Sequence, residues 1–459
     1  KPNAYHADGQ ILEEVYEYGS FTQSRMYQQG VKCSNCHNPH SLKLRAEGNA
    51  LCAQCHAPKT YDTESHHFHP LGSTAAQCVN CHMPGKYYMG NDFRRDHSLR
   101  VPRPDLSARY GTPNACNNCH ADKGVKWQAE AVAAHFGEKR KPHYAEAFLA
   151  FRQGEPGAAD KVAALLEDTA QSDMAKAMSV WNLSASEQAA NWEGFFSRAL
   201  KSPVPFIRHS AVDAFQAFPP ETRVTRLAPM LEDPVRSVRV SAAFILADAG
   251  SSIPKRHKAA YDKAMAEGEQ VLRAQSDFSG GRLRQAQLKM SQGDIAAAEK
   301  AFQSALRLDQ DHPPAVSAAA NFYYGRGQFD KAAVVYQQFL ARNPSEAWAN
   351  YELGLLFAEM QRLEEATSYL AVAAAQSNDP RYSYNWGLAL QNMGKSAEAE
   401  RAFQDGLQKA PGQGYLEYAL AVLYYQRGEL AKARRIAQGL IQKEPQNTEY
   451  LRLFRALGL

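Results

Sequence analysis

The chain has 459 residues, which is enough for two to four domains, each with its own core. Its 52 basic and 48 acidic side chains nearly balance at a formal charge of +4, and this balance gives no support to nucleic-acid binding. The mean hydropathy is −0.51, and no run approaches the eighteen apolar residues of a membrane span, so none is predicted.

The first 143 residues hold all eight cysteines and twelve of the fifteen histidines. The cysteines form four C-x-x-C-H motifs, the attachment pattern of c-type haem, in which two thiols bond one porphyrin and the histidine binds its iron. The motifs comprise Cys33, Cys36 and His37; Cys52, Cys55 and His56; Cys78, Cys81 and His82; and Cys116, Cys119 and His120. The sequence therefore predicts four covalently bound haem c groups, with these four histidines as proximal iron ligands.

Zinc is the alternative cofactor for the first two motifs. Fifteen residues separate Cys36 from Cys52, which fits the spacing of a zinc ribbon. A ribbon does not require a histidine directly after the second cysteine of each pair, whereas haem attachment does. The four repeated histidines therefore favour haem.

Four haems would use every cysteine, so no thiol would remain for a disulfide or for nucleophilic catalysis. Because thioether attachment takes place outside the bacterial cytoplasm, we expect a periplasmic or extracellular, cell-surface location. The sequence begins at Lys1 without an apolar signal segment, so we expect a processed terminus or a longer precursor. The porphyrins should form the core of residues 1–143, with loops, little sheet and short helices, including one over 10–29 and one over 127–136.

Each haem of a multihaem cytochrome usually takes a second histidine, which gives a low-spin iron suited to electron transfer. The distal candidates are His6, His40, His66, His69 and His97. Since His40 lies three residues after a proximal histidine, we expect it to reach a neighbouring haem. Arginines 94, 95, 100 and 103 are expected to pair with haem propionates, because a guanidinium matches a carboxylate.

From residue 144 the sequence becomes alanine-rich and amphipathic. A 31-residue repeat relates Pro203 and Arg208 to Pro234 and Arg239, each arginine opening an apolar helical face. This pattern resembles short HEAT-like repeats. We assign it to residues 144–265.

Residues 266–459 contain a second repeat, of about 34 residues. Small residues recur at Ala286, Ala320, Gly354, Gly387 and Ala421, and an alanine follows each of them twelve positions later. Such residues let two paired helices pack closely, and the pattern matches the tetratricopeptide repeat (TPR). We predict about five repeats and a final cap helix over 447–459, making the fold class mainly α: a loop-rich tetrahaem module followed by a helical solenoid.

Several stretches together resemble multihaem cytochromes c related to the cytochrome c-554 family, with C-terminal TPR repeats. The matching residues are 5–10, 19–21, 33–40, 81–84, 94–97, 102–105 and 111–116. The resemblance covers residues 3–130 and implies periplasmic or extracellular electron transfer, often beside nitrogen or sulfur oxyanion metabolism. Family members often carry further haem sites upstream, and the resemblance implies that His6 could serve such a haem.

Three functions fit these observations. The first is an electron carrier whose helical half docks redox partner proteins or binds a peptide in the TPR groove. The second is a haem enzyme that reduces nitrite, nitric oxide or hydroxylamine at an iron lacking its distal histidine. The third is a subunit that self-associates into a cytochrome filament, because histidines outnumber the ligand positions. No catalytic constellation is visible outside the haem motifs, so we favour the carrier.

Overall fold

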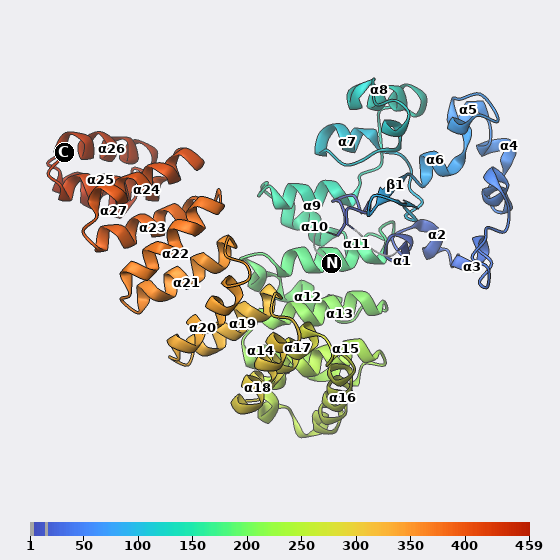
Figure 1. Ribbon diagram of the computed structural model, residues 1–459. Helices are drawn as coiled ribbons and strands as arrows, with labels where there is room; N and C mark the ends of the chain where they lie inside the picture. The colour runs from blue at the N-terminus through green and yellow to red at the C-terminus, as the bar shows by residue number, and fades with distance from the viewer. Residues whose placement is uncertain (1–3, 14–16) are drawn as a thin grey trace. The chain divides into compact units, whose positions relative to one another are not determined.

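The computed structural model describes residues 4–13 and 17–459. The chain divides into two compact units, Lys1–Gly268 and Glu269–Leu459 (Figure 1). Nearly all regular structure is helical, and a short hairpin is the sheet found in the described residues. The predicted mainly α fold class is confirmed.

The N-terminal part of the first unit consists of short helices joined by loops. They are α1 (Glu17–Phe21), α2 (Arg25–Gln28), α3 (Cys33–Cys36), η1 (Gly48–Gln54), α4 (Pro58–Tyr61), α5 (Glu64–His67), η2 (Thr74–Ala76), α6 (Cys78–His82), α7 (Pro104–Tyr110), η3 (Ala115–Asn118) and α8 (Gly124–Phe136). Between residues 33 and 120 the buried hydrophobic side chains are Ala76, Tyr88, Leu106 and Ala115. Such a small protein core leaves room for porphyrins to supply the missing apolar contacts.

The leading segment differs from the single helix expected over 10–29. Residues 14–16 lie outside the described part, and α1 and α2 are separate short helices. The Thr22 hydroxyl donates to the Gly19 carbonyl at 3.0 Å, and the Ser24 hydroxyl accepts the Tyr27 amide hydrogen at 3.1 Å. Because these side chains compete for backbone groups, α1 ends at Phe21 and Ser24 caps α2.

The two strands form an antiparallel hairpin between the third and fourth motifs. Strand β1 (Gly85–Tyr88) pairs with β2 (Asp92–Arg95), and Tyr87 stands opposite Phe93 with ring centroids 5.2 Å apart. The turn is held by the cross-strand aromatic pair and places β2 directly before His97. The hairpin thereby fixes the start of the loop that carries this histidine.

The second part of the first unit is a series of amphipathic helices: α9 (Tyr144–Arg152), α10 (Ala158–Ala164), α11 (Asp173–Ser184), η4 (Ala189–Trp192), α12 (Glu193–Ala199), α13 (Pro205–Ala214), η5 (Phe215–Ala217), α14 (Pro220–Leu227), η6 (Ala228–Glu232), α15 (Arg236–Ile245) and η7 (Ala247–Ser252). The next helix, α16 (Lys255–Ala274), includes the boundary between the two units at Gly268. Helices α13 and α15 carry the 31-residue repeat. Arg208 binds the carboxylate of Asp233 through two nitrogens, at 2.7 and 3.0 Å. Arg239 binds Glu267 in the same way, also at 2.7 and 3.0 Å. In each copy of the 31-residue repeat, the arginine thus forms an ion pair with an acidic residue farther along the chain.

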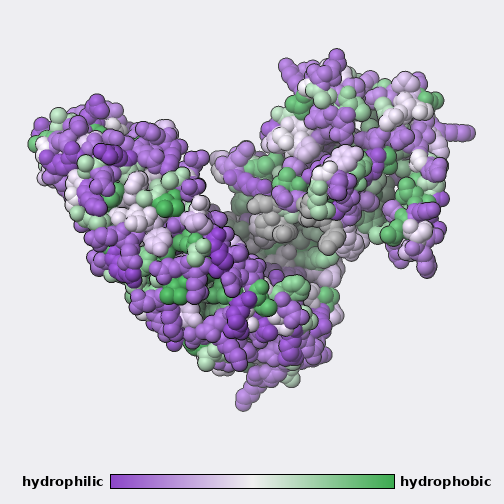
Figure 2. Space-filling model, viewed as in Figure 1, coloured by the Kyte–Doolittle hydropathy of each residue, from purple (hydrophilic) through white to green (hydrophobic). Residues whose placement is uncertain are grey.

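The second unit is a stack of helix pairs: α17 (Ser279–Ser291), α18 (Ile295–Leu308), α19 (Pro313–Tyr324), α20 (Phe329–Leu340), α21 (Ala347–Glu359), α22 (Leu363–Gln376), α23 (Pro380–Asn392), α24 (Ser396–Lys409), α25 (Gly414–Gln426), α26 (Leu430–Lys443) and α27 (Thr448–Ala456). A side chain at Gly387 would place its Cβ 2.4 Å from the buried ring of Phe403. The small residue therefore permits the close contact between α23 and α24. The face of the second unit that is seen in Figure 2 is mainly hydrophilic with local apolar patches.

Candidate haem site

The motifs adopt similar one-turn conformations. The histidine amide donates to the carbonyl of the first cysteine in three motifs, at 2.9 Å for His37, 3.0 Å for His56 and 2.8 Å for His120. The third motif forms the helix α6, which ends at His82. One tight turn therefore places two thiols and one imidazole within reach of the same macrocycle.

The thiols show that the motifs follow one another in space in chain order. Burial raises the pKa of the Cys36 thiol, and the neighbouring thiol of Cys55 raises it further. Burial raises the pKa of Cys52 to about 11, with a further contribution from Cys78, to which its side chain is hydrogen-bonded. Burial likewise raises the pKa of Cys81, followed by the effects of the two thiols of the fourth motif. Helix α6 also packs against both η1 and η3, so the third motif lies between the second and the fourth.

Three proximal histidines lie opposite histidines from other segments. The ring centroids are 6.4 Å apart for His37 and His97, 6.2 Å for His82 and His66, and 6.2 Å for His120 and His69. An imidazole nitrogen binds a transition metal at about 2 Å and the ring centre lies roughly 1 Å beyond it, so two imidazoles on one metal have centres about 6 Å apart. The three pairs fit one iron between the two rings of each.

Backbone carbonyls orient four of these six rings. His37 Nδ1 bonds the Leu42 carbonyl at 3.0 Å, His82 Nδ1 bonds that of Arg100 at 2.8 Å, and His97 Nδ1 bonds that of Arg95 at 2.9 Å. His69 Nδ1 bonds the His67 carbonyl in the same manner. Because a carbonyl can only accept, each Nδ1 carries the hydrogen and each Nε2 keeps a lone pair for a metal.

Among the residues that the structure describes, the other two distal candidates, His6 and His40, and the second motif histidine, His56, are not part of such a pair. Within residues 4–13 and 17–459, neither His6 nor His40 has a ring contact with a proximal histidine. His56 meets the ring of Tyr61 edge-on, with centroids 5.8 Å apart, and Tyr61 in turn meets His66 at 5.4 Å. Tyr61 was not foreseen from the sequence, because nothing in the motif pattern indicates which loop residue lies beside His56.

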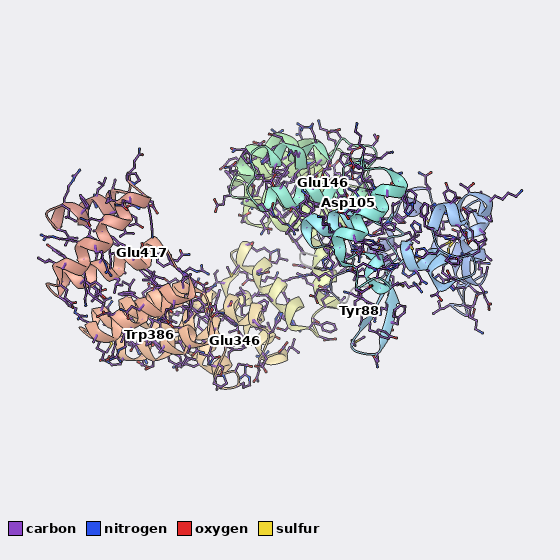
Figure 3. All side chains as sticks on the ribbon, turned by 90° about the horizontal axis from the view of Figure 1, so that it is seen from above. Tyr88, Asp105, Glu146, Glu346, Trp386 and Glu417 are labelled. Carbon is purple, nitrogen blue, oxygen red and sulfur yellow. The ribbon has the colours of Figure 1, made fainter. Side chains whose placement is uncertain are left out.

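The arginines expected to face propionates have protein partners. Arg95 donates to the Val79 and Met83 carbonyls, at 3.2 and 3.1 Å. Arg103 forms an ion pair with Asp105 at 2.7 Å and lies 3.7 Å from Glu146, and both acids are labelled in Figure 3. These bonds tie the loop between the third and fourth motifs to the rest of the unit.

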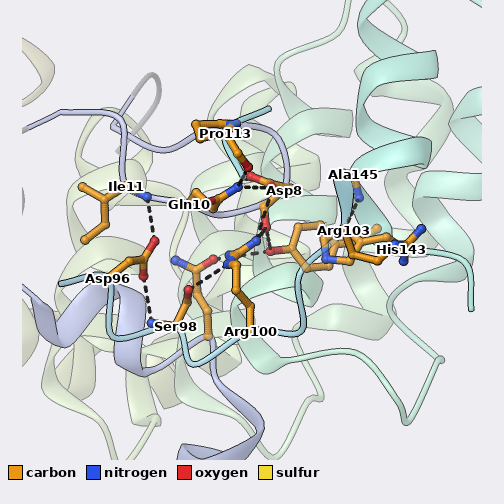
Figure 4. A network of polar contacts seen from close by, with 12 residues as sticks. Asp8, Gln10, Ile11, Asp96, Ser98, Arg100, Arg103, Pro113, His143 and Ala145 are labelled. Carbon is orange, nitrogen blue, oxygen red and sulfur yellow. Dashed lines mark hydrogen bonds and ion pairs between the residues drawn. The ribbon is translucent and has the colours of Figure 1, made fainter. Parts of the chain in front are cut away.

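Arg100 belongs to a buried network that holds the N-terminal segment (Figure 4). Its guanidinium lies 3.3 Å from the carboxylate of Asp8, whose side chain is 3% exposed. Gln10 donates to the same Asp8 oxygen at 2.7 Å, and the Ile11 amide donates to Asp96 at 3.2 Å. The network fixes Arg100, whose carbonyl in turn orients His82.

In the described part of the chain, no three His, Cys, Asp or Glu side chains converge as a self-contained metal site. Nor does any helix there have the length and apolar character needed to cross a membrane.

Two parts of the sequence match the models of known families. Residues 26–61, which span the first two motifs, match the family model described as a doubled CXXCH motif. Residues 283–326, 323–384 and 392–457 match tetratricopeptide repeat models. The C-terminal half carries tetratricopeptide repeats. The doubled motif indicates covalent binding of haem c near the N-terminus. The predictions of TPR repeats and of covalently bound haem c are therefore confirmed.

Two curated proteins each match about a third of this chain. Cellulose synthase operon protein C of Pseudomonas fluorescens (strain SBW25) is 29% identical over 169 residues, which cover 35% of this chain and 13% of that protein. The protein of the same name from Xanthomonas axonopodis pv. citri (strain 306) is 28% identical, with 35% and 11% covered. This chain therefore spans only a small part of these relatives.

Among solved structures, YrrB, described as a TPR protein with an unusual peptide-binding site, matches with 22% identity and a TM-score of 0.34, covering 40% of this chain and 95% of that one. MamA from Desulfovibrio magneticus RS-1 matches with 17% identity and a TM-score of 0.32, covering 37% and 97%.

Proposed function

We propose that residues 1–143 form a tetrahaem electron-transfer module that works outside the cytoplasm. The observation that carries this proposal is the set of three facing histidine pairs, each joining a motif histidine to one outside the motifs. Cys33, Cys36, Cys52, Cys55, Cys78, Cys81, Cys116 and Cys119 would hold the porphyrins. Bound haem supplies a one-electron iron couple at each motif.

The chain's own residues set the ligand environment of these irons. In the proposal His37, His56, His82 and His120 are proximal ligands, and His97, His66 and His69 are the distal ligands of the first, third and fourth haems. The Nδ1 bonds fix the orientation of four of the six paired rings and increase their basicity, which stabilises the oxidised iron. Neighbouring thiols in successive motifs support a continuous row of haems in chain order.

The helical remainder is proposed as a scaffold that docks a redox partner, with residues 144–265 as HEAT-like repeats and 266–459 as the TPR array. The first helices of successive TPR units contact one another, and Asn385 of α23 donates to the Tyr351 hydroxyl of α21 at 2.8 Å. A cavity of about 310 Å³ lies among α18, α19 and α20, lined in part by Phe302, Val334 and Lys331. A face of this kind suits protein or peptide binding.

The proposal is tested on protein made in a bacterium that matures c-type cytochromes. The intact chain should carry the added mass of four haems, and Cys55→Ala with Cys52→Ala should remove one of them. Electron paramagnetic resonance of the oxidised protein should show low-spin signals from at least three haems. A chain that carries zinc or fewer than four haems would refute the tetrahaem assignment.

One observation favours a second candidate, the reduction of a small nitrogen species. His56 is the proximal histidine that meets a tyrosine edge, where the other three meet an imidazole. An iron held by His56 alone would leave a coordination position for nitric oxide, nitrite or hydroxylamine. Titration with nitric oxide or cyanide decides: binding by one haem, lost in the Cys52→Ala, Cys55→Ala chain, supports it, and no binding by any haem excludes it.

A further inference from the structure

Helix α8 closes the module on the fourth motif, and its one fully buried side chain is polar. Gln128 is 1% exposed. Its Nε2 donates to the side-chain oxygen of Asn117 at 2.7 Å and to the carbonyl of His120 at 3.2 Å. Because both partners are oxygens, and the His120 carbonyl can only accept, the amide orientation is fixed.

The other end of the same amide is unsatisfied. Gln128 Oε1 is buried and has no hydrogen-bond partner. Leaving a buried acceptor without a donor is unfavourable, so this unpaired oxygen calls for a function or a partner. The same side chain donates a hydrogen bond to the backbone carbonyl of His120, the fourth motif histidine.

The fourth motif also lacks an arrangement found in the first and third. His37 and His82 each bond a backbone carbonyl through Nδ1. Within residues 4–13 and 17–459, no such bond is made by His120, whose ring instead contacts Trp127 of α8 at 5.3 Å and His69 at 6.2 Å. A histidine that binds a metal through Nε2 almost always donates its Nδ1 hydrogen to an oxygen.

We propose that Gln128 is the positioning residue of the fourth haem site: it fixes the His120 peptide with its N–H group and, once haem is bound, accepts the His120 Nδ1 hydrogen with its buried oxygen. The inference rests on the proposed function, since it concerns the histidine that would bind the fourth iron. Helix α8 would then perform for His120 what the Leu42 and Arg100 carbonyls perform for His37 and His82. Loss of the acceptor would make His120 less basic and favour the reduced iron.

The test compares Gln128→Met with Gln128→Glu in the full-length, haem-loaded protein. Methionine keeps the volume but removes the acceptor. Both variants lose the N–H donor, so the difference between them reports the acceptor. We expect the reduced form of one haem to gain at least about tenfold over its oxidised form, a rise of about 59 mV in one midpoint potential. Glutamate keeps an acceptor and adds negative charge, so the same potential should fall.

Three controls identify the effect. Gln404 is an exposed glutamine on α24 of the second unit and donates to the Glu400 carboxylate at 3.4 Å, so Gln404→Met should leave every potential unchanged. In a chain with Cys116→Ala and Cys119→Ala, which lacks the fourth haem, Gln128→Met should shift no remaining potential. Proton resonances of the reduced protein should show a slowly exchanging His120 Nδ1 hydrogen that becomes fast-exchanging in Gln128→Met.

The outcomes distinguish failure of the proposed tetrahaem function from failure of the positioning role of Gln128. If wild-type protein carries fewer than four haems, the proposed function fails before Gln128 is considered. If four haems are attached and both Gln128 variants shift the potential in the same direction, or neither shifts it, the positioning role is wrong. A purely structural role for Gln128 predicts that both variants shift the potential in the same direction.

Discussion

Acid should weaken the helix that follows the haem module, because its capping residue is a histidine. His143 precedes α9, and its Nδ1 accepts the amide hydrogen of Ala145 at 3.2 Å. Protonation of Nδ1 would remove this acceptor. Burial, followed by the charge of Arg100 and then of Arg103, lowers the pKa of His143 to about 4, although Asp8 and Asp105 act in the opposite direction.

The sign and size of the effect follow from this shift. Below about pH 6.5, the pKa of an unperturbed histidine, His143 is protonated in the unfolded chain but stays neutral in the folded one. The free energy of unfolding therefore falls as the pH drops towards 4. A shift from 6.5 to about 4 corresponds to a loss of about 3 kcal/mol across this range. His143→Asn keeps a good N-cap acceptor that does not titrate, so this component of the acid loss should disappear.

The assay is denaturant unfolding of wild type and His143→Asn between pH 7 and pH 4, with hydrogen exchange of α9 as a local readout. Carboxylates also titrate in acid, but they are common to both proteins, and their contribution cancels in the difference. Helix α20 of the second unit serves as an internal reference. A wild-type-to-variant difference in unfolding free energy that stays constant from pH 7 to pH 4 would refute the reasoning.

Other changes test the ligand pairs and the packing. His97→Ala should convert one ferric haem from low to high spin in its paramagnetic resonance spectrum, whereas His40→Ala should leave every spin state unchanged; equal spectra for the two variants would contradict the pairing. Gly387→Ala should destabilise the second unit by about 1–2 kcal/mol, because overpacking outweighs the gain in helix propensity. Gly439→Ala, also within a helix but with open space around its Cα, should stabilise it by up to about 1 kcal/mol in the same thermal or urea titration. Arg208→Met should cost about 3 kcal/mol in urea, because its acidic partner is 4% exposed and would keep the Val235 amide but lose its bound cation; no change would show that the pair contributes nothing.

What could be read from the sequence was local or periodic. The spacing of Cys33, Cys36 and His37 specifies its own turn, and the small residues at 34-residue intervals specify the contact between paired helices. Both features depend on residues that are near in sequence. Their recognition needs no knowledge of how distant loops meet.

The distal side of the site depends on tertiary contacts and could be predicted only as a set of candidates. His97 and His40 looked equally suitable, yet β2 and the Arg95 carbonyl bring His97 opposite His37, and nothing in the spacing indicates this. Gln128 gave no signal at all, since an isolated glutamine on an alanine-rich helix is ordinary. Its role becomes visible only when its burial and its unpaired oxygen are known.

The segment from His66 to His69 supplies imidazoles facing two different motifs, and this has a consequence for assembly in the proposed location outside the cytoplasm. Both histidines precede the third and fourth motifs in the chain, so on export as proposed they reach that compartment before those motifs emerge. His97, in contrast, emerges long after His37. In the proposed ligand set the last two haems can be completed as soon as they are attached, whereas the first must wait for a later segment, so a stalled or truncated chain would leave its first haem half-coordinated.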